Sequence, residues 1–212
     1  MRASQHIGRE APKLAIYTQK GNTPRSHDHG VQWLEVFDTY VSNTGTLETH
    51  NMPRLKLLGL PETYDTFDPE VTSTVEAQIK GAMIFEDSLV TCRFRTGTQL
   101  DLLCRAINAA TGWDMDFQEA MVVGRRAVNL ARAFNLRHGI PAELDGPSSR
   151  YGSTPVDGVV AGRGILAHWD NMLRNYYKHM GWSEHGRPLP EILRNLGLDH
   201  VISDLWGWNI LS

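Results

Sequence analysis

The sequence predicts a mainly α-helical protein built as one multi-helical domain. Apolar residues recur at helical spacing in several segments, strand signals are sparse, and glycine or proline residues end the periodic segments. The chain has 212 residues, of which 41% are hydrophobic, so it can bury a sizeable core. Because no internal repeat or low-complexity tract divides the chain, we expect residues 1–212 to form a single helical domain.

The first part of the chain predicts an irregular lead-in, a short helix and a longer helix. Glycine, proline and polar residues indicate that residues 1–30 are irregular. Apolar residues of segment 32–42 recur at i, i+3, i+4 and i+7, which predicts a short helix with one buried face. Pro69 can open a helix that runs to Phe85 and would deliver Asp87 at its C-terminal end.

The second part predicts four more helices and one long loop. Segment 99–111 is amphipathic and stops at a glycine, and the acids that follow it offer a cap for a longer helix over 114–137. Prolines and glycines make residues 141–164 the longest loop. The last helices are expected near 168–180 and 190–196, the second closed by a glycine.

Composition excludes several function classes. The formal net charge is -3 and the basic residues are scattered, so we expect no nucleic-acid binding. No apolar stretch approaches the roughly 20 residues of a membrane helix, so we expect no membrane insertion. The first residues lack the apolar core of a signal peptide, which favours a cytoplasmic protein.

The two cysteines, Cys92 and Cys104, are too few for a disulfide framework, and too few to hold an iron–sulfur cluster or a structural zinc by themselves. Any cluster needs ligands from elsewhere. We expect Cys104 to be a core residue. Cys92 differs, because Asp87 precedes it by five residues at the end of an apolar run. A carboxylate can accept hydrogen bonds from a heterocycle and a thiolate can hold iron, so this spacing is that of a cofactor loop.

Residues 87–92 resemble the D-x-x-G-L-C motif of the tungsten-containing aldehyde ferredoxin oxidoreductase family, with Val90 and Thr91 where the motif has Gly and Leu. Further runs appear in the family's order. Residues 109–114 are similar to its A-x-T-G-W-D landmark, and residues 124–139 to its long run ending N-L-x-R-x-F-N-x-R-x-G. Near the C-terminus, the family's D-x-M-L-x-x-Y-Y, G-W and L-G-L landmarks follow. The resemblance implies that this chain is the last helical domain of the family.

The resemblance also implies a cofactor, a tungsten (or molybdenum) bis-pyranopterin with a [4Fe–4S] cluster. Asp87 matches the aspartate that hydrogen-bonds a pterin, and Cys92 matches the cysteine that supplies one ligand to the cluster. The residues between them would contribute further cofactor contacts, mainly through the backbone: Ser88, Leu89, Val90 and Thr91. In this interpretation residues 31–140 hold the cofactor-facing helices, and residues 141–212 hold a loop and the C-terminal helices.

Two histidine segments are further candidates. Residues 41–50 resemble the family's serine- and asparagine-rich turn before a histidine near the metal, which implies that His50 is catalytic and exchanges the substrate's proton. Residues 26–29, Ser-His-Asp-His, could bind zinc only with further ligands, and a solvated loop is the simpler interpretation.

Four arginines of the 114–137 helix could form an anion site, but we interpret them as partners in buried ion pairs between helices: Arg125, Arg126, Arg132 and Arg137.

The family's activity would be oxidation of an aldehyde and water to a carboxylic acid, with electrons leaving through the cluster to ferredoxin or another electron carrier. The required partner is the chain or domains that carry the family's C-x-x-C-x-x-x-C cluster ligands and its β domain. One alternative is the tungsten subunit of an aromatic-CoA reductase such as a benzoyl-CoA reductase. Another is a noncatalytic helical interaction subunit or fragment.

Overall fold

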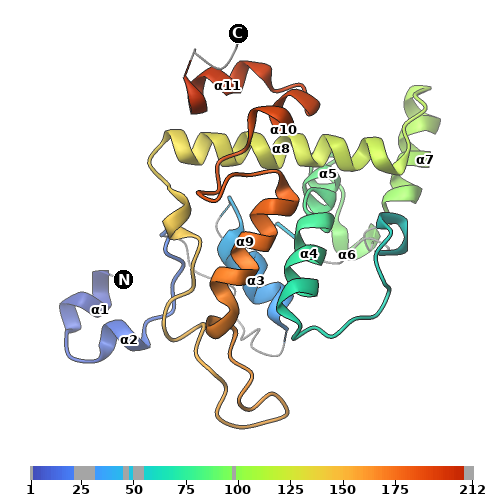
Figure 1. The fold of residues 1–212 in the computed structure, drawn as a ribbon. Helices are drawn as coiled ribbons and strands as arrows, with labels where there is room; N and C mark the ends of the chain where they lie inside the picture. The colour runs from blue at the N-terminus through green and yellow to red at the C-terminus, as the bar shows by residue number, and fades with distance from the viewer. Residues whose placement is uncertain (1, 22–31, 45–47, 50–54, 97–98, 208–212) are drawn as a thin grey trace.

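The computed structural model describes residues 2–21, 32–44, 48–49, 55–96 and 99–207 (Figure 1). Within these ranges the regular structure is helical, with no strand and only two isolated bridges, which confirms the predicted fold class. None of the helices in these ranges is long and apolar enough to cross a membrane. The α-helices are α1 (Arg2–Ile7), α2 (Ala11–Leu14), α3 (Trp33–Val41), α4 (Pro69–Ile79), α5 (Ala82–Ser88), α6 (Arg93–Thr96), α7 (Leu100–Thr111), α8 (Phe117–Arg137), α9 (Trp169–Met180), α10 (Pro190–Asn195) and α11 (Asp199–Trp206). The 3-10 helices are η1 (Leu55–Leu58), η2 (Ala142–Leu144) and η3 (Ile165–His168).

Helix α8 is the long central element of the molecule. Figure 1 shows α10 and α11 on one side of it and α3, α4 and α9 on the other. Its start is fixed by a capping box, in which the Asp116 side chain accepts a hydrogen bond from Glu119 N at 2.8 Å and the Glu119 carboxylate accepts one from Asp116 N at 3.0 Å. The helix ends at Arg137, and Gly139 then takes a φ of 79° that glycine adopts without strain.

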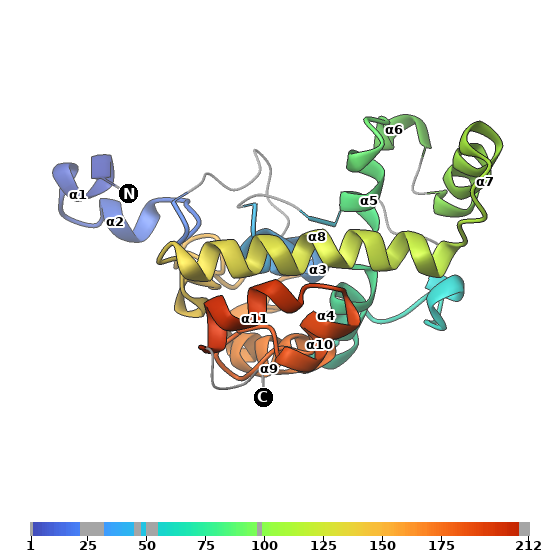
Figure 2. The ribbon, with the colours of Figure 1, turned by 90° about the horizontal axis from the view of Figure 1, so that it is seen from above.

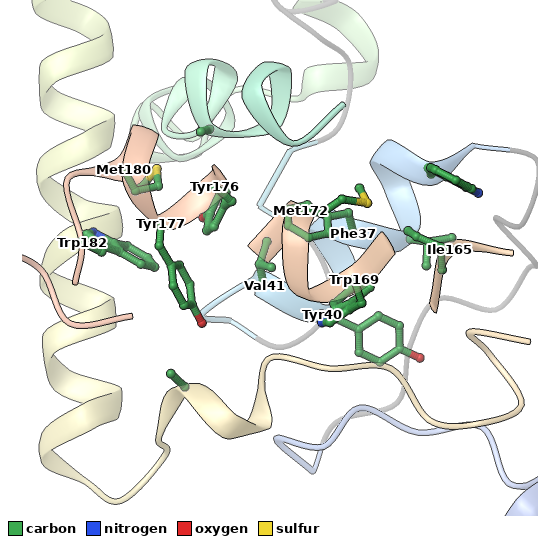
Figure 3. Packing of buried hydrophobic residues seen from close by; sticks show 14 of the residues in the cluster. Phe37, Tyr40, Val41, Ile165, Trp169, Met172, Tyr176, Tyr177, Met180 and Trp182 are labelled. Carbon is green, nitrogen blue, oxygen red and sulfur yellow. The ribbon is translucent and has the colours of Figure 1, made fainter. Parts of the chain in front are cut away.

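The largest core cluster joins α3 and α9, and aromatic and methionine side chains fill it (Figure 3). Phe37 packs edge-to-face on Tyr176 at 5.5 Å between ring centroids, and Tyr40 does the same with Trp169 at 6.0 Å. A second cluster joins α5, α7 and α8. Helix α5 is therefore anchored to the molecule by α8.

The prediction of one helix from Pro69 to Phe85 is wrong. The chain forms α4 and α5 with a break at Gly81, whose φ is 107°. At this break the backbone lies directly on Gly124 of α8. A Cβ atom built on Gly124 would lie 1.9 Å from the Gly81 carbonyl oxygen, so the two glycines permit a contact that other residues would prevent.

Five predicted helices are confirmed, as α3, α7, α8, α9 and α10. The lead-in, predicted to be irregular, contains α1 and α2, and neither helix has a buried residue. Helices α6 and α11 were not predicted. The long loop over 141–164 contains only the short η2.

Candidate functional site

Helix α5 and the turn after it place the motif of residues 87–92. Asp87 and Ser88 are the last residues of α5, and Cys92 directly precedes α6. In Figure 2, α5 and α6 stand out on one side of α8, opposite α10 and α11. We call residues 87–92 the motif turn.

Hydrogen bonds and one apolar anchor fix the motif turn. Val90 N donates to Asp87 O at 3.0 Å, and the Thr91 hydroxyl donates to the carbonyl oxygen of Glu86 at 3.1 Å. The Ser88 hydroxyl donates to a carbonyl of the preceding turn of α5 at 2.6 Å. Leu89 packs against the cluster between α5, α7 and α8. Contacts within this chain therefore hold the backbone of the motif turn in place.

The motif turn presents the two side chains with the most useful chemistry at the surface. Asp87 and Cys92 are both exposed, as is Ser88. The Cys92 carbonyl oxygen accepts a hydrogen bond from Arg95 N at 2.7 Å at the start of α6, so its backbone is held while its thiol faces outward. An exposed carboxylate and an exposed thiol in one short turn can both reach a group outside this chain.

Val90 has a φ of 58°, in the left-handed region that favours glycine. Its side chain is 93% exposed, so no packing explains the residue type. Glycine is the residue that the motif has at this position. The motif turn thus keeps the backbone path of a glycine although it contains a valine.

The second cysteine is unlike the first. Cys104 is 3% exposed in the α5–α7–α8 cluster, and its thiol donates to Asp116 O at 3.4 Å. Burial raises the pKa of this thiol, and nearby Asp116 adds to the rise. The prediction that Cys104 is a core residue is confirmed. Over the described part of the chain, no group of three or more His, Cys, Asp and Glu side chains could hold a metal ion.

A buried charge cluster lies beside the core, and sequence reasoning missed it. Lys80 Nζ lies 2.6 Å from an Asp38 carboxylate oxygen, 2.7 Å from Glu76 and 3.3 Å from Glu48. All four side chains are at most 1% exposed. We call them the Lys80 cluster. It holds the chain before His50, because Glu48 N and Thr49 N donate to the Asp38 carboxylate at 3.1 and 3.0 Å.

In the Lys80 cluster three carboxyl groups surround one ammonium group. This arrangement determines which of the acidic side chains keeps a proton. Burial raises the pKa of Glu76 to about 8, with Asp38 adding to the rise and Lys80 opposing it. Burial disfavours the charged form of Lys80, but Asp38 and Glu76 outweigh it and hold the pKa of Lys80 well above its usual value. Near neutral pH Glu76 therefore retains a proton while Lys80 stays charged.

The arginines of α8 hold the fold together, but by two kinds of contact. Arg132 forms the predicted buried ion pair, with its Nη2 atom 2.8 Å from an Asp145 oxygen. Arg137 forms an ion pair with α11 that is exposed. Arg125 and Arg126 instead donate to backbone carbonyl groups at the ends of α4 and α10, at 3.0 and 2.7 Å. The prediction of buried ion pairs is thus correct for Arg132 only.

Two candidate segments lie outside the described residues: His50 and residues 26–29. The catalytic role of His50 stays a prediction.

Comparison with known families gives one match over most of the chain. The family model "Aldehyde ferredoxin oxidoreductase, domains 2 & 3" matches residues 1–198. The matched region includes the motif turn, the Lys80 cluster and all of α8.

Curated relatives agree. The chain is 33% identical over 192 residues to the tungsten-containing aldehyde ferredoxin oxidoreductase of Pyrococcus furiosus, covering 88% of this chain and 31% of the relative. It is 33% identical over 152 residues to the enzyme of the same name from Pyrococcus abyssi, covering 69% of this chain and 24% of the relative. The match therefore spans about a quarter to a third of the length of these relatives.

The chain also shares its fold with a solved structure. That structure is the active site complex BamBC of benzoyl coenzyme A reductase in complex with 1,5-dienoyl-CoA, with a TM-score of 0.66 and 18% sequence identity. The superposition covers 99% of this chain and 37% of that chain.

Proposed function

The chain belongs to the aldehyde ferredoxin oxidoreductase family, and we propose that it is the cofactor-facing C-terminal part of a tungsten-containing oxidoreductase. The observation that supports this proposal most directly is the motif turn. It combines an exposed carboxylate, an exposed thiol and a glycine-like backbone at Val90 within residues 87–92.

Each residue of the motif turn has a proposed task. The Asp87 carboxylate accepts hydrogen bonds from the amino and ring N–H groups of a pterin, because an ionised carboxylate is an acceptor only. The segment between Asp87 and Cys92 supplies backbone contacts to the same group. The Cys92 thiolate is one ligand of a [4Fe–4S] cluster, and its exposure leaves the sulfur free to meet iron held by other ligands.

A bound tungsten bis-pyranopterin supplies the two-electron chemistry that converts an aldehyde and water to a carboxylic acid, and ferredoxin accepts the electrons. The tasks of this chain are binding, orientation and proton handling. The Lys80 cluster fixes Glu48 and Thr49, next to His50 in sequence. In this proposal His50 exchanges a proton with the substrate.

The remaining cluster ligands come from a partner chain or further domains with a C-x-x-C-x-x-x-C run. The chain has only two cysteines, and Cys104 is buried in the core. The small share of each relative's length that the chain covers supports the same conclusion.

A second candidate function is the tungsten subunit of an aromatic-CoA reductase, with which the fold shared with the benzoyl coenzyme A reductase complex is consistent. Asp87 and Cys92 have the same tasks in both. Aldehyde-dependent reduction of ferredoxin would support the first function, and reduction of an aromatic CoA thioester by a low-potential donor would support the second.

Metal analysis of the anaerobically purified native protein, with everything that copurifies, tests the proposal. We expect tungsten and about four irons per complex, the content of one [4Fe–4S] cluster. The Cys92→Ser variant should lose most of the iron, because serine is a poor ligand in place of the thiolate.

The matched control is Cys104→Ala, which removes the other thiol from the core and should keep its iron. A metal-free preparation that still contains a bound partner would overturn the catalytic proposal and favour a noncatalytic interaction subunit. Equal iron in the Cys92→Ser variant and the native protein would remove Cys92 from the ligand set.

A further inference from the structure

Residues 124–139 of α8 and its C-terminal end match a run of the family, and contacts inside this chain explain most of the residue types in that run. Asn129 donates to Arg125 O at 2.9 Å and accepts a hydrogen bond from the Trp182 ring at 2.8 Å. Asn135 donates to a carbonyl of the chain after α3 at 2.8 Å. Arg132 forms the buried ion pair, and Gly124 permits the close contact with the α4–α5 break.

The side chains of two other residues in the same run are not packed in the core. Leu130 is 45% exposed and Phe134 is 60% exposed, although both are large and apolar. Ala127 is also exposed, and Val123 is half-buried. The four positions are separated by four, three and four residues, the spacing at which one helix packs along another.

A cavity of about 530 Å³ lies beside Val123 at the start of this helix face, and polar or charged side chains form most of its lining: Asp114, Asp116, Gln118, Glu119 and Arg126. We call the exposed apolar face of α8 the apolar stripe, made of Val123, Ala127, Leu130 and Phe134. Several exposed apolar residues on one helix face mark a contact site, whereas single exposed apolar residues are ordinary.

We propose that the apolar stripe is the docking surface for the polypeptide that carries the family's remaining domains, and that a helix of that polypeptide packs along α8. This inference rests on the proposed function. Its occupant follows from the lengths of the relatives, of which this chain covers 24% and 31% in the two cases above. Most of each relative's length therefore lies outside the region that matches this chain, and in this proposal part of it covers the stripe.

The stripe has the features of an interface centre. Aromatic residues, phenylalanine among them, are enriched at the core of protein interfaces. The Phe134 ring stacks on His138 with 4.0 Å between centroids and 25° between planes, so it is already held in place. Ordering it on binding therefore costs little side-chain entropy.

Hydroxyl-radical footprinting tests the stripe in the protein as it exists. The anaerobically purified native assembly is compared with the 212-residue chain alone, and oxidation is read at Leu130 and Phe134. We expect several-fold slower oxidation of both in the assembly. Val156 and Val159, which are 92% and 96% exposed on the long loop, are internal references and should be oxidised equally in both.

A variant pair tests the same surface by association. Leu130→Ser combined with Phe134→Ser should release the companion polypeptide in size-exclusion chromatography with mass measurement, while the circular dichroism stays native. The control, Val156→Ser with Val159→Ser, alters two apolar residues that are even more exposed but lie outside the stripe, and it should keep the companion.

The outcomes separate this inference from the proposed function. If metal and companion are present but the stripe is oxidised as fast as in the isolated chain, the docking inference is overturned and the proposed function stands. If the stripe is protected only by a second copy of this chain, the inference is also overturned. If no further domains accompany the chain and the protein is metal-free, both fail.

Discussion

At the scale of single residues, Val90 has the clearest energetic consequence. A valine at φ 58° places its Cβ atom too close to the following carbonyl oxygen, at a cost of about 1–2 kcal/mol. Because the side chain is almost fully exposed, it recovers little of this cost by packing. The strain lies between Asp87 and Cys92, within the candidate site.

We therefore expect Val90→Gly to raise the free energy of unfolding. The glycine removes the strain but adds freedom to the unfolded chain, so the net gain should be about 1 kcal/mol. Urea denaturation measures it as a higher midpoint with an unchanged m-value.

Val156→Gly is the control for this change, because Val156 is 92% exposed and has no positive φ. It should lose stability, since only the entropy effect acts there. If Val90→Gly loses as much stability as Val156→Gly, the left-handed conformation at Val90 is not a source of strain.

At the scale of elements, the contact between Gly81 and Gly124 determines where α4 ends and α5 begins. The α4–α5 break and helix α8 cross with their backbones in direct contact, and Gly81 also has a positive φ that favours glycine. The direction of α5, and with it the position of the motif turn, follows from this crossing. A substitution at Gly124 therefore acts on a site made of other residues.

Gly124→Ala should lower the free energy of unfolding by about 3 kcal/mol, because its Cβ atom would lie 1.9 Å from the Gly81 carbonyl oxygen and the helices must separate. Thermal and urea unfolding measure the loss. The control is Gly112→Ala, with a φ of 77° and no atom within 4 Å of the new Cβ atom. It should lose only about 1 kcal/mol, from backbone strain. Equal losses would contradict the steric role of Gly124.

The sequence predicts most elements of this fold because local signals define them. The capping residues before α8 mark its start, and Gly112 marks the end of α7. The break at Gly81 was missed because a lone glycine inside a helical pattern is tolerated, and only the contact with Gly124 makes it a break. Helix α6 has four residues, too few for a periodic pattern.

The candidate site was predictable to a different extent. The motif turn could be found because its residues are consecutive. The Lys80 cluster could not, since Glu76 and Lys80 resemble an ordinary surface pair at i and i+4, and Asp38 lies among apolar residues of α3. Burial of all three follows only from the packing of α3, α4 and α9.

At the scale of the whole molecule, the Lys80 cluster makes stability depend on pH. The folded protein holds a proton on Glu76 up to about pH 8, while the unfolded chain releases it near the ordinary value of 4.5. The stabilising effect of this proton is therefore complete below the unfolded pKa and is lost as the pH rises through about 8.

Glu76→Gln should remove this dependence, since glutamine cannot release a proton. Between about pH 5 and 8 the free energy of unfolding of the native protein should fall relative to the variant, with a limiting slope of about 1.4 kcal/mol per pH unit. Denaturation at several pH values measures the difference. Glu70→Gln, at an exposed position of the same helix, should run parallel to the native protein. If the free energy of unfolding of Glu76→Gln changed with pH in the same way as that of the native protein, Glu76 would not be protonated in the folded state.

The charged groups beside the core have one more consequence, which concerns ionic strength. In the Lys80 cluster and in the Arg132–Asp145 pair, every side chain is at most 1% exposed. Dissolved ions screen charges that water can reach, and they have no access to these. The internal electrostatics that place the segment before His50 are therefore the same in dilute buffer and in concentrated salt, whereas the exposed ion pair between Arg137 and Asp204 weakens as salt is added.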